Sequence, residues 1–453
     1  MFNLLWIVIG ILFICCPNEY SRIYCFINFV VYIIFIIKFY RKTNKSNYWD
    51  FDTLFLLVFT VTSYIYPVFI YNESYPFLPF FNNEFNINDI PKGVIASTIA
   101  GCLYMQGSLS SKKNIIKIYN NRKTIKNLKL TIVALFLCAL FFGVGGLDYY
   151  ISNYNSFTTI SGTARTALIL QLEILAVTCI MSALGIELYR IPNNKCPSIF
   201  KLFIRFFKKH KFINRILLIV CLSFAISLAI VGNRTIGLAI IIAIIYIVAE
   251  RFYNINLRTF ALFIVIGFIA MFSIQITRAG YQFNFSDLAF DNVISDFIIP
   301  SRSNFLVYEV LEKKGVSLGA TMLSPIITVI PTLDTFLDSI GINFESSPLY
   351  FTNYTKDMGI VVKTGLGTTL QADVMLAFGW PGLYLFYVLG KYVNTAFRKM
   401  HAGHLYYHII YLCLISMSVY WVRAEFTYPV RLIVWSVVIT YLCTLFKSNI
   451  KQQ

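Results

Sequence analysis

The hydrophobic residues of this chain gather in long continuous runs instead of alternating with polar ones. Each run approaches the roughly 20 residues that a helix needs to cross a bilayer. Backbone groups inside lipid must bond within one segment, and the strands of a transmembrane barrel alternate, so these runs predict α-helices. We predict an all-α, polytopic integral membrane protein with about 12 transmembrane helices, within a range of about 11 to 13. The predicted spans are 2–16, 24–40, 51–71, 93–110, 128–147, 164–186, 216–232, 236–250, 259–276, 371–396, 406–422 and 427–446.

Composition supports the membrane prediction independently of the pattern. Hydrophobic residues make up 58% of the 453 positions and aromatic residues 17%, whereas only 13% are charged. The mean hydropathy is +0.69. So little polar material cannot cover a soluble globule of this length, which excludes an ordinary soluble protein.

The basic residues predict an orientation. Most of the 38 Lys and Arg lie in one alternating set of connections, and the opposite set holds most of the acidic residues. Because basic residues near helix ends stay in the cytoplasm, we expect both termini to be cytoplasmic. The net charge of +17 could suggest a nucleic-acid partner. The cations lie in short loops without an RNA-binding motif, so we expect membrane lipids, and no nucleic acid, as their partners.

The longest interruption of hydrophobicity divides the chain into three predicted regions. These are an N-terminal transmembrane bundle (1–276), a large periplasmic loop (277–370) and a C-terminal group of transmembrane helices (371–453). Within the loop, apolar residues at helical spacing predict amphipathic helices on the outer membrane surface, one of them broken by Pro331. Such helices would guide a lipid-bound substrate or form a structural cap, and the pattern leaves both readings open.

Several arginines are predicted on the outer side, where positive charge is otherwise scarce. Arg234 lies in a tight turn between two apolar runs, and Gly232 permits that turn. An arginine there must snorkel, pair or bind an anion. Guanidinium groups bind phosphate with two hydrogen bonds, so we predict a phosphate or pyrophosphate ligand carried on a lipid, with snorkelling as the alternative. The other outer arginines are Arg165, Arg278, Arg302 and Arg423.

Outer carboxylates supply candidates for a general base. Glu425 follows Arg423 by two residues, Asp373 lies at the mouth of a predicted helix, and Glu309 lies within the outer loop. Each could accept a proton or could instead pair with a nearby arginine. The stretch GLGTT, with Gly365 and Gly367, could cradle an anion with backbone donors, or simply give a flexible entry to the helix. Outer aromatic residues such as Tyr281 could stack on sugar rings or anchor the interface.

These residues, in this order, resemble the O-antigen polymerase (Wzy) family, including the enterobacterial common antigen polymerases. The resemblance rests on Gly232-Asn233-Arg234, the long outer loop, the stretch TGLGTTLQADVMLAFGWPG from Thr364 to Gly382, and Arg423-Ala424-Glu425. It covers roughly the C-terminal half. The N-terminal half matches only as a hydropathy pattern.

The resemblance implies a GT-C-like glycosyltransferase in the bacterial inner membrane with a periplasmic active site. It would transfer a growing glycan from undecaprenyl pyrophosphate onto a lipid-linked repeat unit, with no cofactor and no metal, and a chain-length regulator protein is a candidate partner. Fixed cations would stabilise the departing pyrophosphate. The expected catalytic residues are Arg234, Arg278, Arg423, Glu425 and Asp373, and the expected substrate-binding residues are Arg302, Arg165, Glu309, Gly365, Gly367 and Tyr281.

Other functions stay open at this point. The triplet Asp50-Phe-Asp52 could hold a metal-bound nucleotide sugar, but it lies at a predicted helix start where Asp is also a favoured cap. The related O-antigen ligases use an outer histidine, whereas His210, His401, His404 and His408 are all predicted on the cytoplasmic side. A flippase for lipid-linked oligosaccharides is the third alternative, because Glu173 is an acid within a predicted span, although no repeated half is visible.

Overall fold

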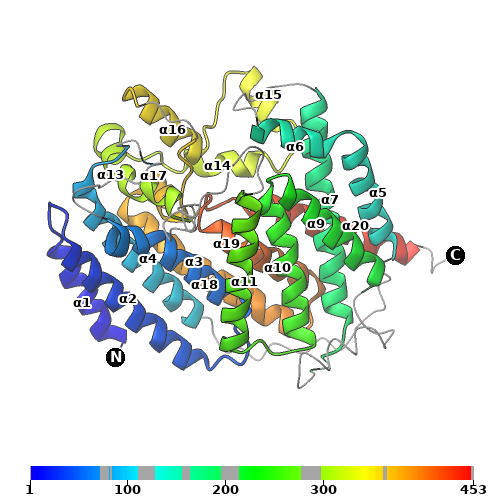
Figure 1. Cartoon of the computed structure of the whole chain (residues 1–453), viewed down its shortest axis with the longest axis horizontal. Coiled ribbons are helices and arrows are strands. Elements are labelled where there is room, and N and C mark those ends of the chain that lie inside the picture. The colour runs from blue at the N-terminus through cyan, green and yellow to red at the C-terminus, as the bar shows by residue number, and fades with distance from the viewer. Residues whose placement is uncertain are drawn as a thin grey trace.

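The protein is an all-helical bundle, as its sequence pattern predicts. The computed structural model describes residues 2–71, 81, 84–110, 128–155, 164–193, 195, 214–276, 297–360 and 365–449. Helix accounts for 80% of the structure, and the described residues contain no strand. Figure 1 shows long helices standing side by side, with a group of shorter helices across one end.

Every predicted apolar run forms helix in the structure. The long helices are α1 (Phe2–Ile14), α2 (Arg22–Thr43), α3 (Phe51–Tyr64), α4 (Ile90–Ser110), α5 (Leu128–Gly143), α7 (Ala164–Arg190), α9 (Arg215–Ile230), α10 (Arg234–Arg251), α11 (Leu257–Ile276), α18 (Tyr384–His401), α19 (Leu405–Trp421) and α20 (Val430–Asn449). The shorter elements are η1 (Ile65–Ile70), η2 (Ile87–Asp89), α6 (Gly146–Asn155), η4 (Ile299–Ser301), α13 (Arg302–Lys314), α14 (Ala320–Ile327), α15 (Leu333–Ser339), α16 (Ser347–Asp357), α17 (Leu370–Phe378) and η5 (Trp380–Leu383).

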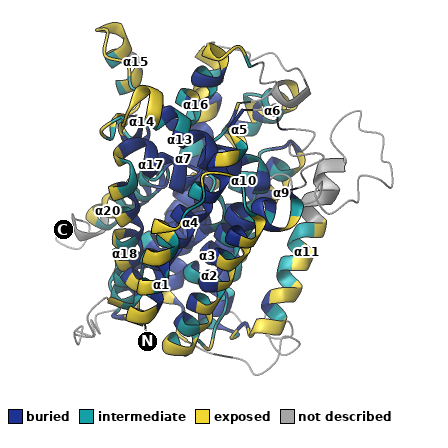
Figure 2. Cartoon of the chain, turned by 90° about the vertical axis from the view of Figure 1, so that its left-hand side faces the viewer, coloured by how far each residue is buried: buried dark blue, intermediate teal, exposed yellow. Residues whose placement is uncertain are grey.

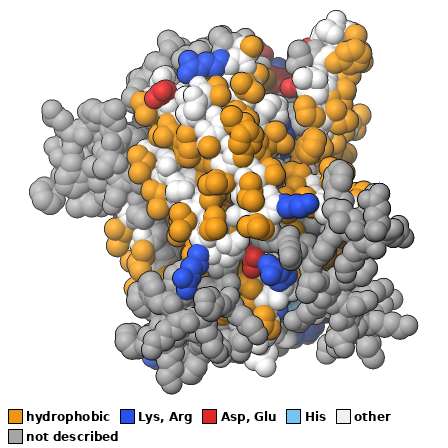
Figure 3. Space-filling view, turned by 90° about the vertical axis from the view of Figure 1, so that its right-hand side faces the viewer, with side chains coloured by type: hydrophobic (Ala, Val, Ile, Leu, Met, Phe, Trp, Pro, Cys, Tyr) orange, Lys and Arg blue, Asp and Glu red, His pale blue; other side chains and the backbone are white. Residues whose placement is uncertain are grey.

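Several of these helices are compatible with a membrane protein. By length and hydropathy, three described helical stretches can each cross a bilayer: α2, α3 continued by η1, and α7. Helices α5 and α6 together make a fourth, bent by 50°. Figure 3 shows hydrophobic side chains spread over the middle of one face of the molecule, with Lys and Arg toward its margins. That distribution suits a surface that faces lipid.

One predicted span is wrong as a continuous helix. The run 371–396 breaks into α17, η5 and α18, because Gly379 adopts φ +65° and Pro381 follows two residues later. The left-handed φ of Gly379 stops the helix, and Pro381 has no N–H group with which to continue its hydrogen bonds, so α17 ends after nine residues. The break leaves α17 as a short helix beside the outer-loop helices (Figure 1).

Close helix packing holds the centre of the bundle. Helices α4 and α18 approach so closely that a Cβ atom on Gly107 would lie 2.0 Å from the carbonyl oxygen of Tyr387, and one on Gly390 would lie 2.1 Å from that of Tyr104. Small residues permit such approach between membrane helices, where van der Waals contact replaces the hydrophobic effect as the main stabilising force. Buried positions fill this centre, whereas exposed positions lie along the outer helices (Figure 2).

The described part of the predicted outer loop forms helices that pack on the bundle. As predicted, helix occurs on both sides of Pro331, in α14 and α15. Helix α13 does not present its apolar face outward, because every residue from Arg302 to Tyr308 is buried and the helix packs on α4 and α17. Exposed apolar side chains lie instead on and beside α14 and α15, where Ile330 and Phe336 are 58% and 60% exposed.

The bundle has two ends with different chemistry. Helix α10 runs from Arg234 at one end to Arg251 at the other, and its 18 residues rise about 27 Å. We call the end formed by the start of α10, the end of α19 and helices α13–α17 the loop end. The end formed by the start of α3 and the last turns of α10 and α18 is called the basic end. Among the predicted outer residues, Asp373, Arg423, Glu425, Arg234 and Arg302 belong to the loop end, and the predicted cytoplasmic residues His401 and Arg251 belong to the basic end.

Candidate functional site

Most of the predicted site residues lie at the loop end. Asp373 lies in the first turn of α17, and Arg423 and Glu425 lie in the turn between α19 and α20. Arg234 and Arg302 are the first residues of α10 and α13. Arg278 and Tyr281 fall outside the described residues.

Two buried carboxylates form the centre of this end. Asp373 is fully buried and Glu425 is 8% exposed. The main-chain N–H of Phe426 donates to Asp373 Oδ2 at 2.8 Å, and the N–H of Ser347, the first residue of α16, donates to Glu425 Oε1 at 3.2 Å. Burial, and then the negative charge of Asp373, raise the pKa of Glu425 to about 7. The two groups therefore form one acidic unit that can hold a proton near neutral pH.

One oxygen of this unit has no partner of its own. The Oδ1 atom of Asp373 is buried and accepts no hydrogen bond from any described residue. The hydroxyl groups of Ser347 and Thr321 approach the Asp373 carboxylate and are its nearest potential donors. A buried acceptor without a donor costs about 1–3 kcal/mol, and Glu84 Oε2 is another such atom among the described residues. Asp373 Oδ1 can accept the proton of a bound hydroxyl group.

Hydroxyl and amide side chains surround the carboxylates. The Ser347 and Thr368 hydroxyl oxygens lie 3.0 Å apart. Thr369 caps α17 by accepting from the N–H of Ala372, and its own hydroxyl donates to Asn304 of α13. All of these polar residues are buried. Helices α13, α16 and α17 thus enclose a polar layer, which fixes the direction of the Asp373 side chain.

Arg302 links this layer to distant parts of the chain. It is 1% exposed, and its Nη1 lies 2.8 Å from Oε1 of the buried Glu84. Its Nε and Nη2 donate to the carbonyl oxygens of Leu366 and Gly365, at 3.2 and 3.1 Å. Sequence reasoning predicted that Arg302 binds substrate, but these contacts are with the protein itself and hold the GLGTT loop in place.

The GLGTT loop turns its oxygen atoms toward Arg302. Gly367 adopts φ +72°, a conformation that favours glycine. The N–H of Leu366 donates to the Thr352 hydroxyl, and that of Leu370 donates to the carbonyl oxygen of Val422. These two N–H groups are therefore committed within the protein. In the structure the loop cradles a guanidinium cation with its carbonyl groups, in contrast to the anion cradle that the sequence suggested.

Arg234 and Arg423 are both half-buried at the loop end. The turn before Arg234 depends on Gly232 at φ +102°. The guanidinium carbon of Arg423 lies 5.5 Å from the centre of the Phe297 ring. Such stacking orients a guanidinium group. Arg423 lies in the turn that carries Glu425, and Arg234 lies next to Asn233, which donates to Glu173.

A second buried acid lies near Arg234. Glu173 of α7 is 2% exposed, and its two oxygens accept from Asn233 Nδ2 at 2.5 Å and from the Tyr150 hydroxyl. The neutral side chains of Tyr150 and Asn233 thus bind Glu173, the acid on which the flippase alternative depends. Tyr428 lies within electrostatic range of both Glu173 and Glu425.

Two predicted residues lie in other surroundings. Arg165 is exposed, and its Nε and Nη2 donate to the carbonyl oxygen of Val144 at the bend between α5 and α6, at 3.1 and 2.9 Å. Glu309 lies 2.7 Å from the exposed Lys313 and accepts a hydrogen bond from Tyr354. The structure does not bring either residue into contact with Asp373 or Glu425.

Sequence reasoning missed several residues of this site. Ser347 and Thr321 carry no motif, and the packing of α14 against α16 and α17 brings them to Asp373. Arg431 in the first turn of α20 donates from Nη2 to Gln171 Oε1 at 3.2 Å and lies within electrostatic range of Tyr428. The available signal was an arginine within the first residues of the predicted span 427–446.

The described histidines and the Asp50-Phe-Asp52 triplet lie at the basic end. His401 pairs with Glu250 at 3.1 Å, and His408 lies 3.2 Å from Arg251 Nη2. Lys45 Nζ lies 2.5 Å from Asp50 Oδ2 and 2.9 Å from Asp52 Oδ2. The lysine occupies the position that a metal would take between the two carboxylates, and the described residues contain no cluster of three or more metal ligands.

Comparison of the chain with protein-family profiles, with curated proteins and with solved structures found no match. The family resemblance of the sequence therefore stays a prediction, and the site geometry is the basis of the proposal that follows.

Proposed function

We propose that the protein is a polysaccharide polymerase that crosses the bacterial inner membrane about twelve times and acts at its periplasmic face, which is the loop end of the bundle. The observation that carries the proposal is the buried pair of carboxylates, Asp373 and Glu425, at the loop end. Arg423 precedes Glu425 by two residues in the same turn. Glycosyl transfer needs an acceptor for a hydroxyl proton and cations for a departing pyrophosphate. The loop end offers both kinds of group.

In the proposed reaction, Asp373 Oδ1 takes the proton from the acceptor hydroxyl of a lipid-linked repeat unit. The acceptor oxygen forms a bond to the anomeric carbon of the growing glycan. The bond from that carbon to the pyrophosphate oxygen breaks, and undecaprenyl pyrophosphate leaves with the electron pair. Arg423 and Arg234 stabilise its charge through hydrogen bonds that need no proton transfer. Arg302 is a positioning residue, because it acts through the GLGTT loop.

Two alternatives receive less support from the geometry. An O-antigen ligase would need an outer histidine. The described part of the loop end contains no histidine, because His401, His404 and His408 belong to the basic end. A flippase would use Glu173 as a titrating acid in a transport path, but Tyr150 and Asn233 already satisfy both of its oxygens. The polymerase proposal uses Asp373, whose Oδ1 accepts no geometrically defined hydrogen bond from the described residues.

A reconstituted elongation assay tests the function. Purified protein in liposomes receives undecaprenyl-pyrophosphate-linked repeat units, and glycan length is followed by gel electrophoresis with and without chelator. We expect longer glycans in both conditions. Movement of the units across the bilayer without any change in length would favour a flippase, and loss of elongation with chelator would contradict the metal-free reaction.

A further inference from the structure

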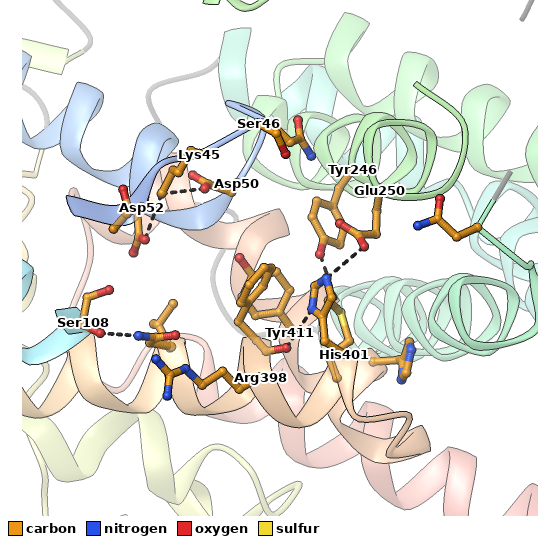
Figure 4. Close-up of a pocket in the computed structure, with 18 of the residues that line it drawn as sticks. Lys45, Ser46, Asp50, Asp52, Ser108, Tyr246, Glu250, Arg398, His401 and Tyr411 are labelled. Atoms are coloured by element: carbon orange, nitrogen blue, oxygen red, sulfur yellow. Dashed lines mark hydrogen bonds and ion pairs between the residues drawn. The ribbon is translucent and has the colours of Figure 1, made fainter. Parts of the chain in front are cut away.

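A polar cavity lies at the basic end of the bundle, remote from the proposed catalytic site. Its volume is about 980 Å³, and its lining comes from the loop before α3 and from the last turns of α2, α4, α7, α10 and α18, together with the start of α19. Helix α10 rises about 27 Å between the loop end and this cavity. Figure 4 shows that the labelled side chains converge on the space between these elements. The proposed polymerase reaction makes no use of it.

The acidic groups of the cavity are already engaged by the protein. Asp50 accepts from the N–H and the hydroxyl of Thr53 at 2.8 and 2.7 Å, besides its ion pair with Lys45. Asp52 binds Lys45 and accepts from the Tyr104 hydroxyl at 2.5 Å. Glu250 binds His401, as Figure 4 shows. A cation entering the cavity would have to displace these donors, so the cavity is poorly suited to a metal or an ammonium group.

Positive charge is in excess around the same space. Five basic side chains line the cavity against three acidic ones. The basic side chains are Lys42, Lys45, Lys195, Arg251 and Arg398, and the acidic ones are Asp50, Asp52 and Glu250. A concave site with low-dielectric walls strengthens the field of such an excess. The cavity therefore attracts anions.

Size and lining narrow the class of anion. A volume near the upper part of the roughly 300–1,000 Å³ range of ligand sites accommodates a molecule as large as a nucleotide. Buried aromatic side chains, Tyr246 and Tyr411, form the inner wall, and exposed polar residues, Asn44 and Ser46, form the rim. Guanidinium and ammonium groups on such a rim favour phosphate oxygens over a single carboxylate.

We propose that this basic-end cavity binds a phosphate-bearing anion, either the headgroup of an anionic lipid or a free phosphorylated molecule. The site is independent of glycan elongation, because it lies at the opposite end of the same helices. Occupation would bridge α2, α10 and α18, whose ends all contribute to the lining of this cavity. A ligand here would thus stabilise the folded bundle by mass action.

The test measures binding of inorganic pyrophosphate to the purified full chain by titration calorimetry, first in detergent and then in nanodiscs of phosphatidylcholine. We expect Arg398→Gln to weaken binding about tenfold, the loss of one charge-assisted hydrogen bond. The matched control is Lys391→Gln on the same helix, whose side chain is exposed and does not line the cavity. This control should bind as wild type does.

A second measurement uses the wild-type chain and no variant. Pyrophosphate should protect Lys42 and Lys195 from acetylation by an amine-reactive reagent, read by mass spectrometry, while Lys391 stays reactive. Protection in nanodiscs that contain cardiolipin, without added pyrophosphate, assigns the site to a lipid headgroup. Protection only by pyrophosphate assigns it to a free molecule. Absence of protection in both arms, or equal pyrophosphate binding by wild type and Arg398→Gln, overturns the proposal whatever the elongation assay shows.

Discussion

The main-chain N–H of Phe426 donates to Asp373 Oδ2 at 2.8 Å and so ties the start of α17 to the turn that carries Glu425. This bond uses one oxygen of Asp373 and leaves Oδ1 without a donor among the described residues. The carboxylate is therefore held in one orientation by the backbone. Such preorganisation is what a general base requires.

Glu425 should make the protein less stable as the pH rises. Burial and the charge of Asp373 raise its pKa from 4.5 to about 7. A raised pKa means that the folded state binds the Glu425 proton more tightly than the unfolded state does. The resulting contribution of Glu425 to the free energy of unfolding is complete below about pH 4.5 and is lost as the pH rises through about 7. The shift corresponds to about 3 kcal/mol. We expect Glu425→Gln to raise the thermal midpoint relative to wild type at about pH 8, and the difference to vanish near pH 4.

Thermal unfolding in detergent, measured across this pH range, checks the Glu425 prediction. The control Glu309→Gln removes an ion pair with the exposed Lys313, which solvent and salt screen. It should show no gain at high pH. A Glu425→Gln variant whose destabilisation grows as the pH rises would mean that the fold prefers the ionised form, and would contradict the prediction.

The ion pair between Arg302 and Glu84 should matter for folding more than for binding. Both side chains are buried, so removing one leaves the other charge uncompensated, at a cost of about 3–5 kcal/mol. We expect Arg302→Met and Glu84→Gln each to lower the thermal midpoint, and the double variant to be less destabilised than the sum of the two. An Arg302→Met protein with unchanged stability and lost lipid binding would restore Arg302 to the substrate site.

Arg234 should act on the departing pyrophosphate. Replacing it with alanine removes a fixed cation, and we expect elongation to fall by about a hundredfold or more while the protein inserts normally. Arg234→Lys should recover little, because an ammonium group cannot make the paired bonds of a guanidinium group. Elongation is measured at equal amounts of folded protein, with Arg258→Ala at the opposite end as the control. Full activity in Arg234→Ala would remove this residue from the site.

The sequence pattern predicted the helices well because hydrophobic runs record burial directly. Its failure at 371–396 has a local cause, since Gly379 and Pro381 interrupt a run whose average hydropathy stays high. The buried face of α13 escaped prediction for another reason. A helix that packs on α4 and α17 has the same periodicity as one that lies on a membrane.

The sequence predicted several residues of the candidate site but not the contacts between them. Asp373 and Glu425 stood out as outer carboxylates, and the structure brings them together. The partner of Arg302 could not be predicted, because Glu84 lies 218 positions away and no local pattern links the two. Ser347 was also missed, because it lies 78 positions from Glu425 and contacts it through its main-chain N–H, which no side-chain pattern reveals.

The most direct test of the account is the elongation rate of Asp373→Asn in liposomes that hold lipid-linked repeat units. Asparagine preserves the shape of the side chain and an acceptor for Phe426 but cannot take a proton, so we expect the rate to fall by about 10²- to 10⁴-fold. Asp357→Asn, at an exposed position of α16, should elongate as wild type does. An Asp373→Asn protein that folds and elongates at the wild-type rate would contradict the account.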